Sequence, residues 1–367
     1  MKNLFYTFEK MKYISAKLYP LQGKNYLIME TKDHFYFDQQ NGDILETITV
    51  FSKDVRFVCN DSHTNVYAIE IDEKQLKLTV LPEQNEHLFE LAGIDEFVIG
   101  LAIGSHSLLV KTCRDLSEDS QKINMYYIDT KADMIMLCNN NILNNSYHMP
   151  YISICGNEEY IIAESAVIHP YEIDEARKNT SFIYKNDILA VSLRRLIEAV
   201  SNNRELKWNV ISSAKEGYYV NILQVKGSHI WLLETTTNEI KTNIVKYDLS
   251  NGMADINLFI ENRIDKAVFN EDTLLCMYKW NSSKEQINIY NLQGDVISNL
   301  NYAILTNEND EIELNEILSI LDDRYVIFHA ADYSTDDEKQ IRVIYDMLKR
   351  IYKVYYAPFL MYCGKYY

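Results

Sequence analysis

The feature that most constrains the fold of this 367-residue chain is a pattern of four short apolar segments that returns along its whole length. The last copy is the clearest, with the segments Ile317–Ile320, Tyr325–Ala330, Ile341–Tyr345 and Ile351–Tyr356. Such segments are short and rich in β-branched and aromatic residues, which is typical of strands. A copy begins about every 50 residues. The chain is therefore built from small similar units.

Polar turns separate the segments inside each copy. A turn rich in Gly, Asn or Asp precedes the second segment, as at Gly156-Asn157 and Gly227-Ser228. Asn-Gly follows the third segment at Asn41-Gly42 and Asn251-Gly252. Asn-Gly between apolar segments is a strong signal for a tight antiparallel hairpin. Each copy is therefore predicted to be a sheet of four antiparallel strands.

Seven such sheets in succession predict an all-β fold, a single seven-bladed β-propeller. One short helix is predicted in blade four, within residues 194–203, where Leu196, Ile197 and Val200 have helical spacing. The predicted blades are approximately 13–51, 55–91, 96–138, 150–211, 218–260, 264–305 and 316–356. The terminal segments 1–12 and 357–367 are candidates for closing the ring.

The order of segments and turns resembles the WD40-like group of seven-bladed propellers over most of residues 13–356. The third segments end in Tyr-Asp, as at Tyr247-Asp248 and Tyr345-Asp346, and the sequence contains no Trp-Asp pair. The Gly-Ser-His turns at 104–106 and 227–229 do not stand where that family has Gly-His. The resemblance therefore implies the architecture and no functional residue.

The charge of the chain favours some partners over others. It has 53 acidic and 36 basic residues, a formal net charge of −17. Nucleic acid and anionic membranes would be repelled, so the predicted partner is a protein or peptide with a basic surface. The alternative is that the charge serves solubility alone. No apolar run reaches the roughly 18 residues of a membrane-spanning helix, the first ten residues lack a signal-peptide core, and the six cysteines contain no Cys-x-x-Cys, so a cytoplasmic location is expected.

Local motifs of catalysis are missing from the sequence. It contains no Walker loop, no Gly-x-Gly-x-x-Gly, no His-Glu-x-x-His and no Gly-x-Ser-x-Gly. His106 and His229 stand in turns that look equivalent, in blades too far apart to share a metal ion. The paired carboxylates Glu158-Glu159 are interpreted as turn residues. The sequence thus predicts no catalytic residue, no metal ligand and no cofactor.

Insertions cluster in the loops between the second and third strands and between blades, which open on one face of a propeller. The longest is 165–186 in blade four, and 306–316 is strongly acidic. Long loops in a compact repeat are often functional, although drift in tolerant loops gives the same pattern. The predicted partner-binding residues are His169, Tyr171, Glu172, Asp174, Glu175, Arg177, Asp310, Glu311, Glu313, Asp336 and Asp337.

The leading functional prediction is a non-catalytic protein- or peptide-binding scaffold that presents this acidic, loop-rich rim. The alternative is a propeller enzyme, a hydrolase or lyase, with polar residues from several blades converging at the mouth of the central channel. A binder of small ligands or carbohydrates is a third reading. Three or more His, Asp, Glu or Arg side chains converging at that mouth, around a pocket of several hundred Å³, would favour the enzyme.

Overall fold

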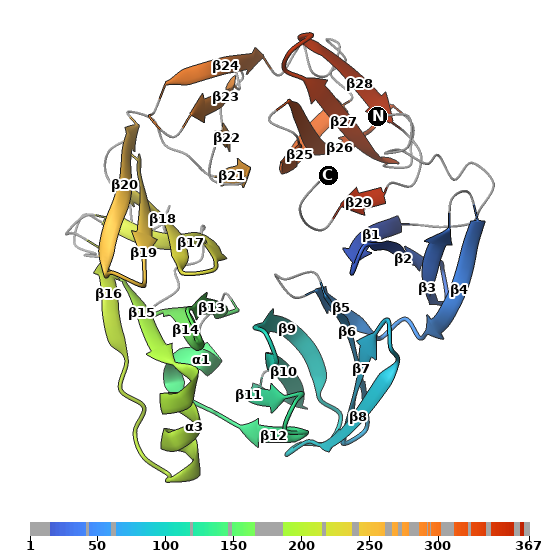
Figure 1. Cartoon of the computed structure of the whole chain (residues 1–367), viewed down its shortest axis with the longest axis vertical. Coiled ribbons are helices and arrows are strands. Elements are labelled where there is room, and N and C mark those ends of the chain that lie inside the picture. The colour runs from blue at the N-terminus through green and yellow to red at the C-terminus, as the bar shows by residue number, and fades with distance from the viewer. Residues whose placement is uncertain are drawn as a thin grey trace.

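The computed structural model of the chain describes residues 15–41, 44–59, 64–117, 120–145, 149–165, 186–214, 218–236, 242–260, 266–270, 274–278, 286–291, 293, 295–301, 312–321, 324–334, 339–355 and 360–362. Within these residues the strands form one five-stranded sheet and six four-stranded sheets. Figure 1 shows the sheets arranged in a ring, with the first strand of each four-stranded sheet nearest the centre. The protein is therefore an all-β propeller.

In the first three sheets, strands that are neighbours in the chain also pair with each other. The first contains β1 (Ser15–Leu21), β2 (Lys24–Glu30), β3 (Phe35–Asn41) and β4 (Ile44–Phe51). The second contains β5 (Arg56–Cys59), β6 (Val66–Asp72), β7 (Gln75–Leu81) and β8 (Asn85–Glu90). The third contains β9 (Phe97–Ile103), β10 (Ser107–Ser117), β11 (Ser120–Asp129) and β12 (Met134–Leu137), and helix α1 (Asn141–Asn145) follows it.

The remaining sheets repeat the same order. The fourth contains β13 (Tyr151–Cys155), β14 (Glu158–Glu164), β15 (Asp187–Ser192) and β16 (Asn209–Ser213), with helix α3 (Leu193–Ser201) between β15 and β16. The fifth contains β17 (Tyr218–Lys226), β18 (His229–Thr236), β19 (Thr242–Asp248) and β20 (Met253–Ile260). The sixth contains β21 (Lys266–Asn270), β22 (Leu274–Tyr278), β23 (Gln286–Asn291) and β24 (Val296–Asn301). The seventh contains β25 (Ile312–Leu321), β26 (Tyr325–Asp332), β27 (Lys339–Asp346) and β28 (Ile351–Tyr355).

Tight turns explain why neighbouring strands pair in this way. Leu21 pairs with Lys24 across the two-residue turn Gln22-Gly23. Both turn residues have a positive φ, 50° for Gln22 and 77° for Gly23. Two positive φ angles are the mark of the type I′ turn, whose twist matches that of antiparallel strands. The turn chemistry thus fixes the register of the hairpin.

The hydrophobic core lies between the sheets, because each sheet buries both of its faces. In β6, Val66 and Ala68 pack against the first sheet, whereas Tyr67 and Ile69 pack against the third. All four side chains are at most 1% exposed. A sheet covered on both faces needs continuous apolar runs rather than strict alternation. Each sheet is therefore stabilised mainly by its neighbours in the ring.

A short C-terminal strand, β29 (Leu360–Tyr362), joins the end of the chain to its beginning. It pairs in parallel with β1, with Ala16 opposite Leu360 and Leu18 opposite Tyr362. Figure 1 shows it on the side of β1 nearest the centre. One of the two candidate ring-closing segments, 357–367, therefore contributes a strand to the first sheet. The other, 1–12, lies outside the described residues.

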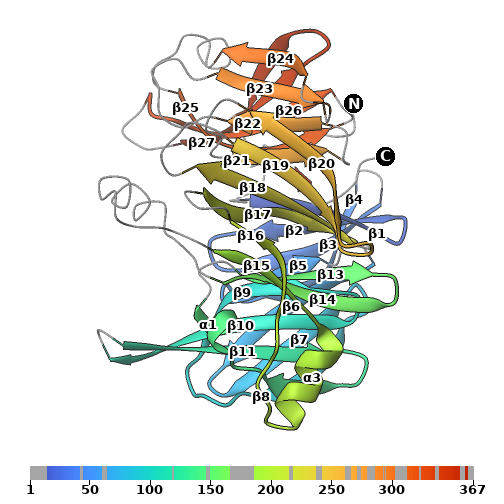
Figure 2. The same ribbon diagram turned by 90° about the vertical axis from the view of Figure 1, so that its left-hand side faces the viewer.

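Two features distinguish the two faces of the ring. The β10–β11 hairpin projects from one face, and α3 lies at the other (Figure 2). The turn between β13 and β14 is on the α3 face.

Neither helix in the described part of the chain is long and apolar enough to cross a lipid bilayer.

Candidate functional site

The predicted acidic rim falls almost entirely outside the part of the chain that the structure describes. Glu313 lies in β25, where its backbone pairs opposite Ala331. The other predicted residues lie outside the described residues: His169, Tyr171, Glu172, Asp174, Glu175, Arg177, Asp310, Glu311, Asp336 and Asp337. The proposed rim therefore stays a prediction.

A pocket of about 830 Å³ opens between the third and fourth sheets, on the face where α3 lies. Six ionisable side chains besides tyrosine line it: His106, Asp129, Glu158, Glu159, Arg194 and Glu198. They come from two sheets that are neighbours in the ring. The six ionisable groups and the volume of the pocket therefore exceed the three groups and several hundred Å³ that would favour an enzyme. The pocket lies between two sheets and not at the central mouth where such a site was expected.

Chain reversals on one face bring these residues together. The β9–β10 turn carries Ser105 and His106, and β11 ends at Asp129. In the next sheet, the β13–β14 turn leads into Glu158, and the first turn of α3 carries Arg194. Turns between first and second strands lie on the same face as the ends of third strands. The geometry of two adjacent blades thus assembles the pocket.

Glu159, in β14 of the fourth sheet, is hydrogen-bonded to the third sheet. Its Oε1 accepts a hydrogen bond from the backbone N–H of Ser105 at 2.5 Å, and its Oε2 accepts one from the hydroxyl of Ser107. A side chain at Gly104 would collide with the same carboxylate, so glycine permits the close approach. Glu159 therefore holds the third sheet to the fourth, and Ser107, 2% exposed, is bound to it.

Tyr127 lies at the base of the pocket and keeps its proton. It is 3% exposed, and its hydroxyl donates to Oδ2 of Asp129 at 3.5 Å. Burial raises the pKa of Tyr127 far above its usual value, and the carboxylates of Asp129 and Glu159 raise it further. Asp129 is itself fixed, because its Oδ1 accepts the backbone N–H groups of Lys131 and Ala132, both at 2.9 Å.

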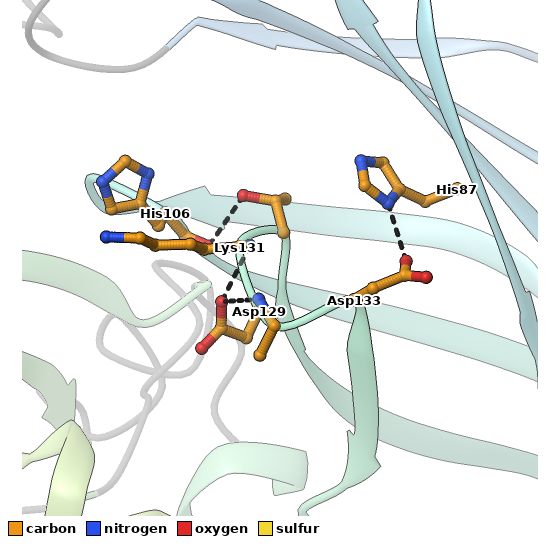
Figure 3. Close-up of polar contacts among 7 residues, drawn as sticks. His87, His106, Asp129, Lys131 and Asp133 are labelled. Atoms are coloured by element: carbon orange, nitrogen blue, oxygen red, sulfur yellow. Dashed lines mark hydrogen bonds and ion pairs between the residues drawn. The ribbon is translucent and has the colours of Figure 1, made fainter.

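His106 is exposed on its turn, and its imidazole makes no hydrogen bond or ion pair with the described residues. The turn is held instead by its backbone, since the carbonyl of His106 accepts from the N–H and the hydroxyl of Thr130 at 2.9 and 3.0 Å. Figure 3 contrasts this free imidazole with His87, whose Nδ1 is 2.7 Å from Oδ1 of Asp133. Of these two histidines, His106 is therefore the one whose imidazole can act on a ligand.

The rim of the pocket carries further charged groups. Nε of Arg194 is 3.0 Å from Oε1 of Glu198, one helical turn further along α3, and both side chains are largely exposed. Oε2 of Glu158 accepts the hydroxyl of Tyr160 at 2.8 Å. Four carboxylates and one guanidinium therefore face the pocket. This balance suits a neutral or cationic ligand better than an anionic one.

A second cluster joins the fourth sheet to the fifth, at the end of β14 away from the pocket. Glu164 is 4% exposed, and its Oε1 accepts the backbone N–H of Ile222 in β17 at 2.9 Å. Burial raises the pKa of Glu164 to about 7, although the Ile222 bond opposes the shift. Burial raises the pKa of Tyr151, and the charge of Glu164 raises it further. A carboxyl group that titrates near neutral pH can exchange a proton in function or in conformation.

The register of the strands corrects the expected equivalence of His106 and His229. His229 is the first residue of β18 and pairs with Asp248. The corresponding first residue of β10 is Ser107, which pairs with Asp129. The two Gly-Ser-His triplets are offset by one residue, so His106 occupies the turn position of Ser228: the carbonyl of each accepts the N–H of the residue after the third strand, Thr130 and Leu249 respectively. The two histidines therefore have different surroundings.

No protein-family model and no curated protein matches the sequence of this chain. Solved structures are similar in fold. A prolyl endopeptidase structure covers 94% of this chain with a TM-score of 0.54 and 7% identity, and prolyl oligopeptidase B from Galerina marginata covers 95% with a TM-score of 0.55 and 9% identity. This chain spans 50% and 52% of those two chains, about half the length of the peptidases.

An oligogalacturonate lyase, solved in complex with manganese, is similar over nearly its whole length. It covers 97% of this chain, this chain covers 95% of it, and the TM-score is 0.53 at 8% identity. At such identities the likeness shows the fold alone. These structures come from enzymes, and that finding contradicts the leading prediction of a non-catalytic binding scaffold.

Proposed function

We propose that the chain is a propeller enzyme, a hydrolase or lyase, that acts in the pocket between the third and fourth sheets. The observation that carries the proposal is the convergence of His106 with four carboxylates and Arg194 on a pocket of about 830 Å³. Pockets of several hundred Å³ with converging polar groups are where enzymes bind small substrates. The fold similarity to peptidases and a lyase supports the same class.

His106 is proposed to transfer the proton. An imidazole changes its charge near neutral pH, and this one is exposed and has no partner among the described residues. Tyr127, held protonated, is a hydrogen-bond donor at the base of the pocket. Ser107 is an unsuitable nucleophile because it is buried and bound to Glu159. These features favour general acid–base catalysis over a serine-nucleophile mechanism.

The finer architecture belongs to the same proposal. We infer that the sheets are the seven blades of one WD40-like ring over the ranges predicted from sequence, with α3 as the insertion of blade four. The excess of carboxylates around the pocket supports a substrate with a neutral or cationic group, in keeping with the basic partner predicted from the net charge.

The test is a comparison of two histidine variants on a panel of chromogenic peptide, ester and glycoside substrates from pH 5 to 9. His106→Ala should lower kcat/KM by about 100-fold or more, since loss of a general acid or base typically costs that much. His87→Ala is the matched control, because His87 lies on the neighbouring sheet and pairs with Asp133 away from the pocket lining. It should keep the wild-type rate. Absence of turnover on the whole panel would refute the hydrolase form of the proposal, and equal rates for wild type and His106→Ala would refute the role of His106.

A further inference from the structure

We propose that His229, Asp248 and Asp255 on the fifth sheet bind a divalent metal ion of the zinc class. They come from three neighbouring strands, at the start of β18, the end of β19 and the beginning of β20. Each residue offers one ligand atom, and these three atoms lie within 4.8 Å of one another. One nitrogen and two carboxylate oxygens are a donor set that zinc and cobalt accept. This site is separate from the proposed catalytic pocket.

The register of the sheet accounts for the meeting of the three side chains. His229 and Asp248 are direct partners across β18 and β19. Between β19 and β20 the register shifts, since Lys246 pairs with Ile256 and Tyr247 with Ala254. Asp255 is thus the extra residue of a β-bulge. Bulges re-aim side chains, and this one brings Oδ2 of Asp255 to 4.0 Å from Nε2 of His229.

The 4.0 Å separation is too long for a hydrogen bond, which needs about 2.7–3.2 Å. Two ligands of one tetrahedral zinc ion lie about 3.3–3.5 Å apart, because Zn–N and Zn–O bonds are about 2.0–2.2 Å long, so a bound ion would draw the two atoms together by about half an ångström. Asp255 is exposed, so its side chain is free to make this movement and to close the separations of up to 4.8 Å within the group.

Asp248 is held in place before any ion binds. It is 9% exposed, its Oδ1 accepts the backbone N–H of Ser250 at 2.9 Å, and its Oδ2 accepts the hydroxyl of Ser250 at 2.7 Å. The carboxylate also accepts a hydrogen bond from the side chain of Ser228, so of its roughly four lone-pair sites about one is left for a metal. Hydrogen bonds of this kind orient a ligand, and a rigid ligand improves metal affinity.

A second His–Asp pair provides the contrast. His87 and Asp133 are in direct contact at 2.7 Å (Figure 3). Within the described ranges, the group with metal-binding geometry is the one on the fifth sheet and does not include this pair. Both pairs combine an imidazole with a carboxylate. His87 and Asp133 are in direct contact, whereas His229 and Asp255 are separated and lie beside the buried carboxylate of Asp248.

The test uses the full chain, freed of metal with a chelator and titrated with Zn²⁺ by calorimetry and with Co²⁺ by visible absorption. The wild type should bind one ion per chain. His229→Gln and Asp255→Asn should each weaken binding by at least 10-fold, because loss of a group that merely orients a ligand already costs about 10–100-fold. His87→Gln is the control and should bind as the wild type does.

Two results would overturn the site: no saturable binding of Zn²⁺ or Co²⁺ by the wild type, or equal affinity in the wild type and Asp255→Asn. Asp255 is exposed, so its substitution leaves the fold intact, and circular dichroism checks this. A rise in Tm with Zn²⁺ in the wild type that is lost in both variants would provide an independent readout.

Discussion

Single carboxylates join neighbouring sheets in this molecule, and β14 carries two of them. Glu159, near its start, accepts bonds from Ser105 and Ser107 in the third sheet. Glu164, at its end, accepts a bond from Ile222 in the fifth. Successive side chains of a strand point to opposite faces, so an odd and an even position reach opposite neighbours. The fourth sheet is thereby tied to both sides of the ring.

Glu164 should make stability depend on pH. The pKa of Glu164 is about 7 in the folded chain, against 4.5 for an ordinary glutamate, so the folded state binds more protons between these pH values. Stability should therefore fall as pH rises from about 4.5 to 7, by up to about 3 kcal/mol for this one group. Glu164→Gln should remove that slope, as urea unfolding at pH 5 and pH 8 would measure.

The control for this effect is Glu158→Gln, a change at an exposed residue of the same strand. It should leave the slope of the wild type. Parallel pH profiles for the wild type and Glu164→Gln would contradict the role assigned to Glu164.

At the scale of elements, α3 shows how a local signal becomes part of a site. Leu193, Leu196 and Ala199 are buried, and the two leucines pack into the core between the third and fourth sheets. The opposite side of the helix carries Arg194 and Glu198 to the pocket. The helical spacing was readable in the sequence, whereas the position of the helix beside the third sheet depended on packing.

The N-cap of α3 should contribute measurably to stability. Ser192 has extended backbone angles, and its side chain accepts the N–H of Arg195 at 3.4 Å. Ser192→Ala should cost about 0.5–1 kcal/mol of unfolding free energy in urea, because it leaves a helix N–H without its acceptor. Ser192→Asp retains an acceptor and should keep most of the stability. Equal losses in both variants would exclude the cap as the cause.

At the scale of the whole molecule, β29 joins the two ends of the described chain. Its three residues pair with Ala16, Lys17 and Leu18 of β1. The seventh sheet already has its own four strands, so the closing contact is an added fifth strand on the first sheet. The ring is therefore closed by a short contact that deletion can remove cleanly.

Deletion of residues 357–367 should lower stability by about 2 kcal/mol, since the strand supplies only a few backbone hydrogen bonds of about 1 kcal/mol each. Thermal unfolding would report this as a lower Tm. Deletion of residues 363–367 alone retains β29 and is the matched control. If both deletions give the same Tm, β29 does not stabilise the ring.

The strands and turns were largely predictable, because their signals are local. The Gln22-Gly23 turn and the apolar run of β6 each depend on a few adjacent residues. The pocket was not predicted: Glu158-Glu159 was interpreted as a turn pair, and His106 was compared with the wrong residue of the fifth sheet. A signal that could have revealed the pocket is that turns of adjacent blades face each other, because Ser105 then lies opposite Glu159.

The sequence by itself determined the strands, their hairpins and the repeated sheet, because hydrophobic period and turn chemistry act over a few residues. Only the tertiary structure decided which polar groups meet. Ser105 and Glu159 are 54 residues apart, and Glu164 and Ile222 are 58 apart. Their contacts depend on how one sheet packs on the next. An offset of one residue in the strand register leaves His106 in a turn where His229 is already in a strand. One bulge in β20 brings Asp255 close to His229. Such shifts are settled by packing and not by local pattern.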